Sequence, residues 1–578
     1  FPYTTLFRSD DLNEPMIGVS IVEKGTANGC ITDIDGNYTL NVKQGATLVY
    51  SYIGYVALER KAVAGVMNII LKEDSQALDE VVVVGYGVQK KSSVTGAISQ
   101  VKSEDIQNRS ITRAEEALQG KTAGVQLVST TSQPGSSPTI RIRGFSSNGT
   151  SDPLYVVDGL IVNDLSSIDP NNIKSMEVLK DAASAAIYGA QAGNGVVLIT
   201  TKSGSQGTSS ISYDFQYSIN SLARRPELLN SQEYLTQMKE ADPTFTDVNI
   251  RELISNGVWD GVSSTDWYDV AFNASPASRH TVTFQGANDK GSYFLSLNNL
   301  YDNGIIREDR DTYKRLSVML NADYKIKPWL KVGTTANYAN YTSKAISDGS
   351  GGTSYVSMIA TVMTLAPYIA DTYPADALPT QMQAQIANGF TLLQNANGDY
   401  YSCLGTMEQV HPMVAIRMND KKNTGNSLMG TLYANFTPIK DLVFTTRLGY
   451  RIATDNTYTH NNLYYGSASA SNKDRNGVTR TSLSTTYYQW ENFVNYNTTL
   501  LDTHNISAML GMSYSQSDQI YVSAGVDKIA KDNLLYADVD WPAGDAVKST
   551  GGHNYIYRKL SYFGRVGYDY KNRYMAQF

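Results

Sequence analysis

Two glycine-containing stretches of the sequence have residue types that could bind nucleotide phosphates. In LDEVVVVGYGVQKK, residues 78–91, four valines lead into GYG at 85–87, which supplies the first two glycines of a dinucleotide fingerprint. The third glycine position holds Lys90, and no 3.6-residue apolar stripe follows, so no helix is predicted to receive a pyrophosphate. In QGKT, residues 119–122, Glu115 stands where a Walker A loop needs its first glycine. The sequence therefore favours neither nucleotide site.

Other residues with catalytic or metal-binding chemistry are few and far apart. Two cysteines, Cys30 and Cys403, are too few for a disulfide framework or a cysteine metal cluster. The five histidines never occur as H-x-x-x-H or H-E-x-x-H. Asp33, Asp35 and Gly36 resemble the start of a calcium loop, but the remaining ligands do not follow, so a β-turn is favoured. With no nucleophile elbow or paired carboxylates either, the sequence predicts no metal site, no cofactor and no enzyme.

Composition excludes two large classes of protein. The 578 residues carry a net charge of −7, from 48 basic and 55 acidic residues, so the chain lacks the basic surface that nucleic acid binding needs. The sequence has no run of about eighteen apolar residues, so no membrane-spanning helix is predicted. The 40 tyrosines and 45 glycines stand out. Aromatic rings with a polar edge are favoured where one side is wet and the other apolar, which points to a protein at an interface.

The N-terminal part of the chain divides into a foreign start, a small β domain and a linker. Residues 1–9, FPYTTLFRS, resemble the translation of a sequencing adapter, so we expect the protein's own sequence to start inside a domain, with any signal peptide missing. Residues 10–73 carry short β-branched and aromatic runs between Gly and Asp turns, which predict an incomplete β-sandwich. Residues 74–110 are polar after the valines and are predicted to be a linker.

Residues 111–204 predict a compact α+β unit. Thr112 and Glu115 have the spacing of a capping box before EEALQ, which predicts a short helix that ends at Gly120. PLYVVDGLIV predicts a strand, a turn at DG and a second strand. TIRIRGF alternates apolar and basic residues as an exposed strand would, DAASAAIYG predicts a short helix, and GVVLITT predicts a buried strand.

From about residue 205 the pattern changes to strict two-residue alternation. In RLSVMLNADYKI, residues 315–326, the even positions are mostly apolar and the odd positions mostly polar. DLVFTTRLGYRI, residues 441–452, repeats the pattern, with Arg447 and Arg451 on the polar face. Each strand is expected to run for about ten residues, which is the length of a tilted membrane-crossing strand.

The connections between these strands alternate in length. Tight turns occur at 325–332, 437–443 and 570–574, whereas long, polar, glycine-rich connections span 342–426, 453–482 and 516–556. A transmembrane β-barrel sorts its turns in this way, with short ones at one end and long ones at the other. We count roughly eleven strands, an odd number that single-chain bacterial barrels do not use. The sequence is therefore expected to be cut at both ends, with residues 205–578 forming half of a barrel of about 22 strands.

Five segments of the predicted α+β unit carry a resemblance to a known family. They are ALQGKTAGVQL (117–127), IRIRGFSSNG (140–149), PLYVVDGLIV (153–162), DPNNIKSMEVLKDAASAAIYG (169–189) and GVVLITTKSG (195–204). In this order they resemble the plug of the SusC/RagA-type TonB-dependent transporters of Bacteroidetes outer membranes, and the resemblance covers the chain from about residue 10 to its end. GVSIVEKGT and TDIDGNYTL are similar to the carboxypeptidase-regulatory-like domain that precedes the plug in this family. The fold class implied is mainly β, namely a partial transmembrane antiparallel β-barrel with an α+β plug and an N-terminal β-sandwich.

The valine run resembles the family's TonB box, the segment that the energy-transducing protein TonB binds. Its residues are Leu78, Asp79, Glu80, Val81, Val82, Val83 and Val84. Valines favour the extended state, and an extended segment can add as a strand to the edge of a partner's sheet. The alternative is an ordinary strand of the preceding sandwich.

The resemblance also implies a set of plug motif residues. They are Arg141, Arg143, Gly144, Asp158, Gly159 and Gly195. The two arginines are candidates for contacts between the plug and the barrel wall, with a solvated strand face as the alternative. At Gln191 the sequence departs from the family, which usually has an arginine nearby.

As a function, the resemblance implies TonB-dependent active import of an oligosaccharide or peptide across the outer membrane of a Gram-negative bacterium. TonB, with its ExbB/ExbD energy system, would act on a periplasmic N-terminal domain and TonB box. A SusD-like surface lipoprotein would cover the long loops, and the barrel would face outer membrane lipid. The alternative is a passive receptor or porin-like barrel, which has no use for a plug or a TonB segment.

Overall fold

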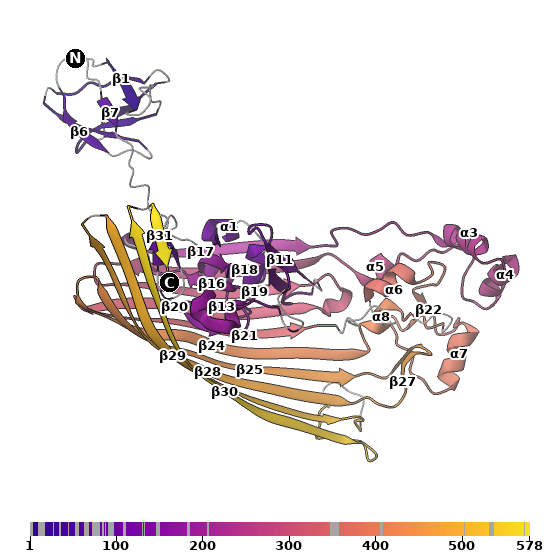
Figure 1. Ribbon diagram of the computed structural model, residues 1–578. Helices are drawn as coiled ribbons and strands as arrows, with labels where there is room; N and C mark the ends of the chain where they lie inside the picture. The colour runs from indigo at the N-terminus through magenta and orange to yellow at the C-terminus, as the bar shows by residue number, and fades with distance from the viewer. Residues whose placement is uncertain are drawn as a thin grey trace. The chain divides into compact units, whose positions relative to one another are not determined.

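Figure 1 shows the chain as a computed structural model that divides into two compact units. The first comprises residues 1–82 and 88–94, and the second comprises residues 83–87 and 95–578. The structure describes residues 4–9, 18–26, 28–33, 36–43, 45–52, 57–62, 69–71, 81–83, 86, 88–90, 97–107, 111–129, 131, 133–145, 149, 151–181, 185–204, 207–346, 358–404, 409–501, 503–530, 537–571 and 573–578. Both the predicted α+β unit and the alternating strands fall in the second unit.

The first unit contains two small sheets that share one core. The four-stranded sheet has the order β3-β2-β5-β6, with β2 at Ser20–Glu23, β3 at Gly29–Ile31, β5 at Thr47–Ser51 and β6 at Leu58–Lys61. The three-stranded sheet has the order β4-β1-β7, with β1 at Thr4–Ser9, β4 at Asn37–Thr39 and β7 at Ile69–Leu71. Ile21, Tyr50 and Leu71 are fully buried in the shared core. The predicted β-sandwich is confirmed, while the foreign origin of residues 1–9 stays a prediction.

The plug, which lies in the second unit, is built on a five-stranded sheet in the order β10-β15-β16-β13-β14. Its strands are β10 (Ile98–Lys102), β13 (Leu154–Val157), β14 (Leu160–Val162), β15 (Ile173–Leu179) and β16 (Val196–Thr201). A separate pair is formed by β11 (Val125–Val128) and β12 (Thr139–Ile142), and short helices are α1 (Ser103–Gln107), η2 (Ala114–Leu118), η3 (Pro170–Asn172) and η4 (Ala186–Ala192). The sheet takes in β10, which precedes residue 111, where the sequence places the start of the plug.

The helix predicted before EEALQ, which is η2, starts differently from the prediction. The carboxylate of Glu116, not that of Glu115, accepts hydrogen bonds from the backbone N–H groups of Thr112 and Arg113, at 3.0 and 3.4 Å. Glu115 is buried and pairs with the Arg113 guanidinium at 2.8 Å. The prediction missed this arrangement because the helix is a tight 3₁₀ turn. In this turn the Glu115 carboxylate is paired with the buried Arg113 guanidinium, so Glu116 caps the helix instead.

The remainder of the second unit contains one antiparallel sheet of 11 strands in the described part of the chain, which confirms the strand count. Its strands, in spatial order, are β17 (Gly207–Asn220), β18 (Ser275–Ala287), β19 (Gly291–Asn303), β20 (Thr312–Lys327), β21 (Leu330–Lys344), β24 (Asn419–Ile439), β25 (Leu442–Asn461), β28 (Val478–Leu500), β29 (His504–Val526), β30 (Lys548–Tyr570) and β31 (Tyr574–Gln577). Each strand pairs with the next one in this series, so the sheet is a simple up-and-down wall.

The strands are longer than the ten residues that the alternation predicts. Three of them, β28, β29 and β30, have 23 residues each. Apolar alternation marks only the part of a strand that faces lipid, whereas the backbone hydrogen bonds of the ladder continue where both faces are polar. The strand length predicted from the sequence was therefore wrong, because the pattern that was counted ends before the strand does.

The alternation does predict which face of each strand is exposed. On β20, Leu316 and Ile326 are about half exposed, while Arg315 on the opposite face is 2% exposed. On β25, Leu448 and Ile452 are exposed in the same way. The apolar face of the wall therefore points outward, and the polar face points toward the plug.

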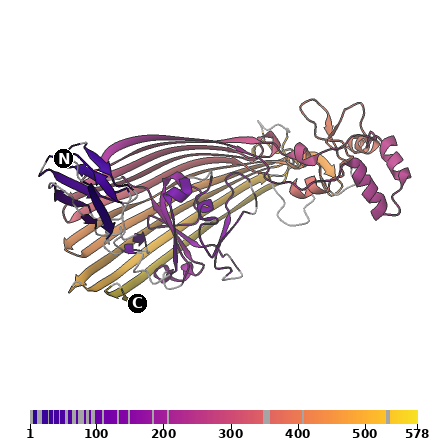
Figure 2. The same cartoon turned by 90° about the horizontal axis from the view of Figure 1, so that it is seen from above.

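The two ends of the sheet carry connections of different length, as Figures 1 and 2 show. At one end, neighbouring strands join through tight turns, such as those between β20 and β21 and between β24 and β25. At the other end lie the long connections with α3 (Ser231–Ala241), α4 (Asp247–Ser255), α5 (Trp267–Ala271), η5 (Arg307–Asp309), α6 (Met358–Thr364), α7 (Thr380–Ala387), α8 (Pro412–Ala415) and the strand pairs β22 (Thr372–Tyr373) with β23 (Tyr400–Tyr401) and β26 (Tyr464–Ser467) with β27 (Ala470–Asn472). The predicted sorting of turns by length is confirmed.

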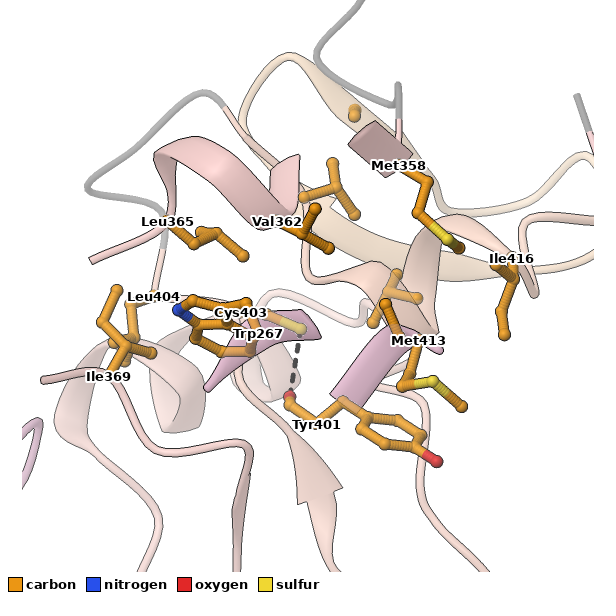
Figure 3. Packing of buried hydrophobic residues seen from close by; sticks show 14 of the residues in the cluster. Trp267, Met358, Val362, Leu365, Ile369, Tyr401, Cys403, Leu404, Met413 and Ile416 are labelled. Carbon is orange, nitrogen blue, oxygen red and sulfur yellow. Dashed lines mark hydrogen bonds between the residues drawn. The ribbon is translucent and has the colours of Figure 1, made fainter. Parts of the chain in front are cut away.

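The long connections pack around a hydrophobic core of their own, which Figure 3 shows from close by. Trp267 is 1% exposed at its centre, and its indole N–H donates to the carbonyl of Ala366 at 3.2 Å. Cys403 and Val362 pack in the same cluster. The sequence predicts only polar, glycine-rich loops here, and it misses this core because the apolar residues come from segments far apart in the chain. Across the described residues, no helix is long and apolar enough to cross a membrane.

Candidate functional site

Three residues of the predicted TonB box lie in a two-stranded sheet. Val81–Val83 form β8, which pairs with β9 (Val88–Lys90) in a two-stranded sheet. Residues 78–80 and 84 of the box lie outside the described residues. Because β8 pairs with β9, the described strand belongs to neither sheet of the sandwich.

Tyr86, between these two strands, is buried in an aromatic pocket of the second unit. Its ring stacks on that of Phe563 on β30, with ring centroids 4.3 Å apart and an interplanar angle of 20°. Phe493 on β28 meets it edge-on at 5.2 Å, and Tyr188 of the plug lies at 5.9 Å. Offset-stacked and edge-to-face rings at such distances attract one another beyond their burial, so this pocket holds the Tyr86 ring on three sides.

The Tyr86 hydroxyl joins a buried ion pair of the wall. It donates to Glu491 Oε1 at 2.6 Å, and Arg447 donates to Glu491 Oε2 from Nε at 2.8 Å and from Nη2 at 2.5 Å. Burial raises the pKa of Tyr86, and the adjacent Glu491 carboxylate raises it further. The hydroxyl therefore stays protonated, and it completes the hydrogen bonding of a carboxylate that water does not reach.

The same arginine lies against the DG turn of the plug. Asp158 and Gly159 both have positive φ, at 48° and 87°, as expected for the predicted turn between β13 and β14. A Cβ atom at Gly159 would come within 1.9 Å of Arg447 Nη1, so the close approach requires glycine. Gln489 on β28 also binds this turn, because its side-chain amide donates a hydrogen bond to the Gly159 carbonyl at 3.0 Å. Asp158 itself turns inward and accepts hydrogen bonds from Thr201, at 3.0 and 2.6 Å.

A different buried ion pair joins the plug directly to the wall at Asp169. Arg315 on β20 donates from Nη2 to Asp169 Oδ2 at 2.7 Å, and both side chains are almost fully buried. Burial opposes ionisation of Asp169, but the Arg315 guanidinium outweighs it and holds the pKa of this carboxyl below its usual value. Arg315 also donates to the backbone carbonyl of Ser166 at 3.0 Å, and Asn337 on β21 donates to that of Ser167 at 2.9 Å. The segment that leads to η3 is therefore tied to two strands of the wall.

The remaining predicted plug residues show local contacts and turn conformations. Arg141 places its guanidinium 4.0 Å over the Phe145 ring, and Arg143 and Gly144 both have positive φ. Among the described residues, no hydrogen bond or ion pair joins either arginine to the wall, so their role in wall contacts stays a prediction. Gly195 has a φ of 88°, and a Cβ there would lie 2.8 Å from Ile142 Cδ1, so the turn before β16 needs glycine.

Gln191, where the sequence departs from the family, does reach the wall. Its side-chain oxygen accepts a hydrogen bond from Lys559 Nζ on β30 at 2.6 Å. A neutral acceptor suits this position, since an arginine would place a second cation beside Lys559.

Sequence analysis did not predict the buried contacts that join the plug and Tyr86 to the wall. Tyr86, Glu491 and Asp169 were absent from the predicted site. Arg315 and Arg447 lie at polar positions of alternating strands, and a charged residue on the inner face of a wall needs a partner. That was the available signal, but the partner of Arg315 lies 146 residues away and no spacing rule reveals it.

Two family matches cover the first part of the chain. Residues 90–196 match the TonB-dependent Receptor Plug Domain, and residues 8–83 match the CarboxypepD_reg-like domain. Similar proteins include TonB-dependent receptor SusC of Bacteroides thetaiotaomicron, 31% identical over 98% of this chain and 55% of its own length. TonB-dependent receptor P26 of Formosa agariphila is 29% identical over 96% of this chain and 53% of its own length. The chain thus spans about half the length of the curated relatives that it matches.

Solved structures share the fold. The RagAB peptide transporter aligns with a TM-score of 0.68 and 23% identity over 83% of this chain and 54% of its own. An antiparallel wall with a plug bound to its polar face, together with these matches, defines a TonB-dependent receptor. Over nearly its whole length the chain is similar to SusC-type members of these receptors, and it carries their plug domain. This agrees with the prediction that the chain is not an enzyme, because the family is one of receptors.

Proposed function

We propose that the complete protein imports an oligosaccharide or a peptide across the outer membrane of a Gram-negative bacterium. TonB, anchored in the inner membrane and driven by ExbB and ExbD, would bind residues 78–84 and draw the plug away from the wall. The outer membrane holds no nucleotide fuel of its own, so the energy must come from such a partner.

The observation that carries this proposal is the plug held against the wall by the buried ion pair of Arg315 with Asp169. Both side chains of this pair are almost fully buried, and separating a buried pair is strongly unfavourable. A passive porin-like barrel gains nothing from a plug that thermal motion rarely releases. A plug of this kind suits a transporter that opens only when work is done on it.

The domain limits follow from the same proposal. Residues 10–73 would be a periplasmic domain, and the TonB box and linker would begin at residue 74. The plug would run from β10 at Ile98, earlier than the predicted start at residue 111, to residue 204, and residues 205–578 would be the barrel wall. The short turns would then face the periplasm and the long connections the cell surface, with the apolar outer face of the wall in lipid.

The long connections are the proposed substrate-capture surface, covered by a SusD-like lipoprotein. Their shared core around Trp267 supports this assignment, because a folded surface can present a fixed shape to a lid. The similarity to RagAB, a peptide transporter, supports a peptide substrate. The many tyrosines, whose rings suit stacking on sugar faces, support an oligosaccharide.

The test is a proline in the TonB box of the full-length protein. Val82→Pro removes a backbone N–H that strand addition uses, so we expect TonB's C-terminal domain to bind at least about tenfold more weakly in a pull-down titration. Val82→Ile is the matched control, because it keeps both the N–H and the β-branched side chain.

Cells that carry each variant are then supplied with fluorescent peptides and dextrins. Active import predicts that Val82→Pro and a protonophore each abolish accumulation, while Val82→Ile accumulates label normally. Equal accumulation by both variants, with no effect of the protonophore, would show a passive barrel and remove the proposal.

A further inference from the structure

Tyr86 occupies the place in the chain where a pull on the valine run would first meet a buried side chain that the structure describes. It stands two residues after Val84 in the sequence, and two residues of chain can span at most roughly 7 Å. The first strand of the plug sheet, β10, begins at Ile98, twelve residues beyond Tyr86. Tension applied at residues 78–84 therefore acts on Tyr86 before it acts on the plug.

We propose that Tyr86 is a latch, whose side chain must leave its pocket between the plug and strands β28 and β30 before the plug can be released. The latch rests on the import function proposed above, and it assigns to one residue the step that links the TonB box to the wall. The side chain is built for such a step, since one end is an apolar ring between Phe563 and Phe493 and the other is a hydroxyl on Glu491.

Withdrawal of Tyr86 changes the contacts of a single connected group. Glu491 loses the hydrogen bond to one of its two oxygens and, among the described residues, keeps only Arg447 as a hydrogen-bond donor. Arg447 in turn loses the Tyr86 ring, whose centroid lies 5.6 Å from its guanidinium carbon. The Arg447 guanidinium lies in close contact with Gly159. Once it has lost the Tyr86 ring it can move, and this movement loosens the turn between β13 and β14.

That turn is well placed to open first. β14 is the edge strand of the plug sheet, with β13 as its one described neighbour in that sheet, so it can separate without breaking the ladders of β15 and β16. The other described hydrogen-bond partner of this turn on the wall is Gln489. Its side-chain oxygen accepts a hydrogen bond from the Ile161 N–H at 3.3 Å, and its side-chain nitrogen donates to the Gly159 carbonyl. The latch also favours its own return, because the vacated pocket leaves two phenylalanine rings in contact with water.

The Tyr86 hydroxyl allows the latch to be distinguished from simple packing of the ring, because it can be removed without removing the ring. Tyr86→Phe keeps the ring and removes only the bond to Glu491, and Tyr86→Ala removes both. Tyr188→Phe is the matched control, since it takes a hydroxyl from the same pocket and the described hydrogen bonds include none from that hydroxyl to Glu491. Hydrogen–deuterium exchange is measured on the full-length protein in nanodiscs, without TonB, for peptides covering residues 81–90 and 154–162.

We expect Tyr86→Phe to exchange roughly tenfold to a hundredfold faster in both peptides, as loss of a hydrogen bond to a charged acceptor implies. Tyr86→Ala exchanges faster still, and Tyr188→Phe stays within about twofold of the unmodified protein. Exchange by Tyr86→Phe that matches the Tyr188→Phe control would overturn the latch. Faster exchange confined to residues 81–90 would also overturn it, because the wall would then fail to pass the change to the plug.

The uptake assay separates this inference from the function on which it rests. Normal accumulation by Val82→Pro, alongside faster exchange in Tyr86→Phe, would locate the failure in the import function, and the latch role would fall with it. Loss of accumulation by Val82→Pro, alongside unchanged exchange in Tyr86→Phe and Tyr86→Ala, would leave the import function standing and refute the latch alone.

Discussion

The ion pair of Arg315 and Asp169 offers the sharpest test of how the plug is held. The two side chains are 1% and 0% exposed, and their charged atoms lie 2.7 Å apart. Asp169→Asn keeps the shape of the side chain but leaves the guanidinium without a counter-charge. Removal of one partner of a buried pair costs about 3–5 kcal/mol. That cost corresponds to a rise of about a hundredfold to several thousandfold in the equilibrium for plug opening.

The assay is a urea titration of the full-length protein, in which exchange of the plug peptide 169–179 reports opening. We expect Arg315→Met with Asp169→Asn to cost less than the sum of the two single changes by about 2 kcal/mol or more, because the double variant buries no unpaired charge. Lys121→Met is the control, since Lys121 pairs with Asp105 on the plug surface at 3.0 Å with both side chains more than 40% exposed. An exposed pair contributes about 0–1 kcal/mol.

The pH dependence of plug stability is a second test of the same ion pair. The pKa of Asp169 is lowered in the folded protein, so its contribution to stability is present above its usual value of 3.8 and is lost as pH falls through the lowered value. The urea midpoint of the plug should therefore hold from pH 7 to about 4 and then drop, and Asp169→Asn should remove that part of the drop. The buried-pair account would be refuted if the cost of the double variant equalled the sum of the costs of the two single variants. A cost below about 1 kcal/mol for Asp169→Asn would also refute it.

Three further predictions concern single sites. Gly159→Ala should destabilise the plug by about 1–3 kcal/mol more than Gly144→Ala in the urea titration, because both glycines have positive φ but only Gly159 lacks room for a Cβ; equal costs would contradict this. Trp267→Ala should cost the long connections about 3–5 kcal/mol and make them susceptible to limited proteolysis, while the half-exposed Trp541→Ala should not. Burial raises the pKa of Asp311 to about 7, so the folded turn at 304–312 favours the protonated carboxyl group and loses stability as that group ionises. Hydrogen exchange in this turn, corrected for intrinsic rates, should therefore quicken between pH 4 and 8. Asp311→Asn should abolish that slope, and a slope that persists would point to another group.

Local pattern was sufficient for the architecture of the wall. Alternation at residues 315–326 predicts both a strand and the face that is exposed, because side chains on a strand point to opposite sides with a period of two. Arg315 and Leu316 confirm this with opposite burial. The turn at DG was likewise readable, since two residues with positive φ between apolar runs favour those types. The limits of the strands were not readable, because ladder hydrogen bonds extend beyond the apolar pattern.

The sequence by itself thus determined the sandwich, the plug's principal strands, the eleven-stranded wall and the sorting of its turns, all of which depend on neighbours in the chain. Only the tertiary structure decided what holds the plug and Tyr86 against the wall. Tyr86 meets Glu491 across 405 residues, and Arg315 meets Asp169 across 146. Such pairs carry no local signal, because a buried charge is stabilised by whichever opposite charge the fold brings within a few ångströms. The same reason hid the core around Trp267, whose apolar residues gather only when distant loops fold against one another.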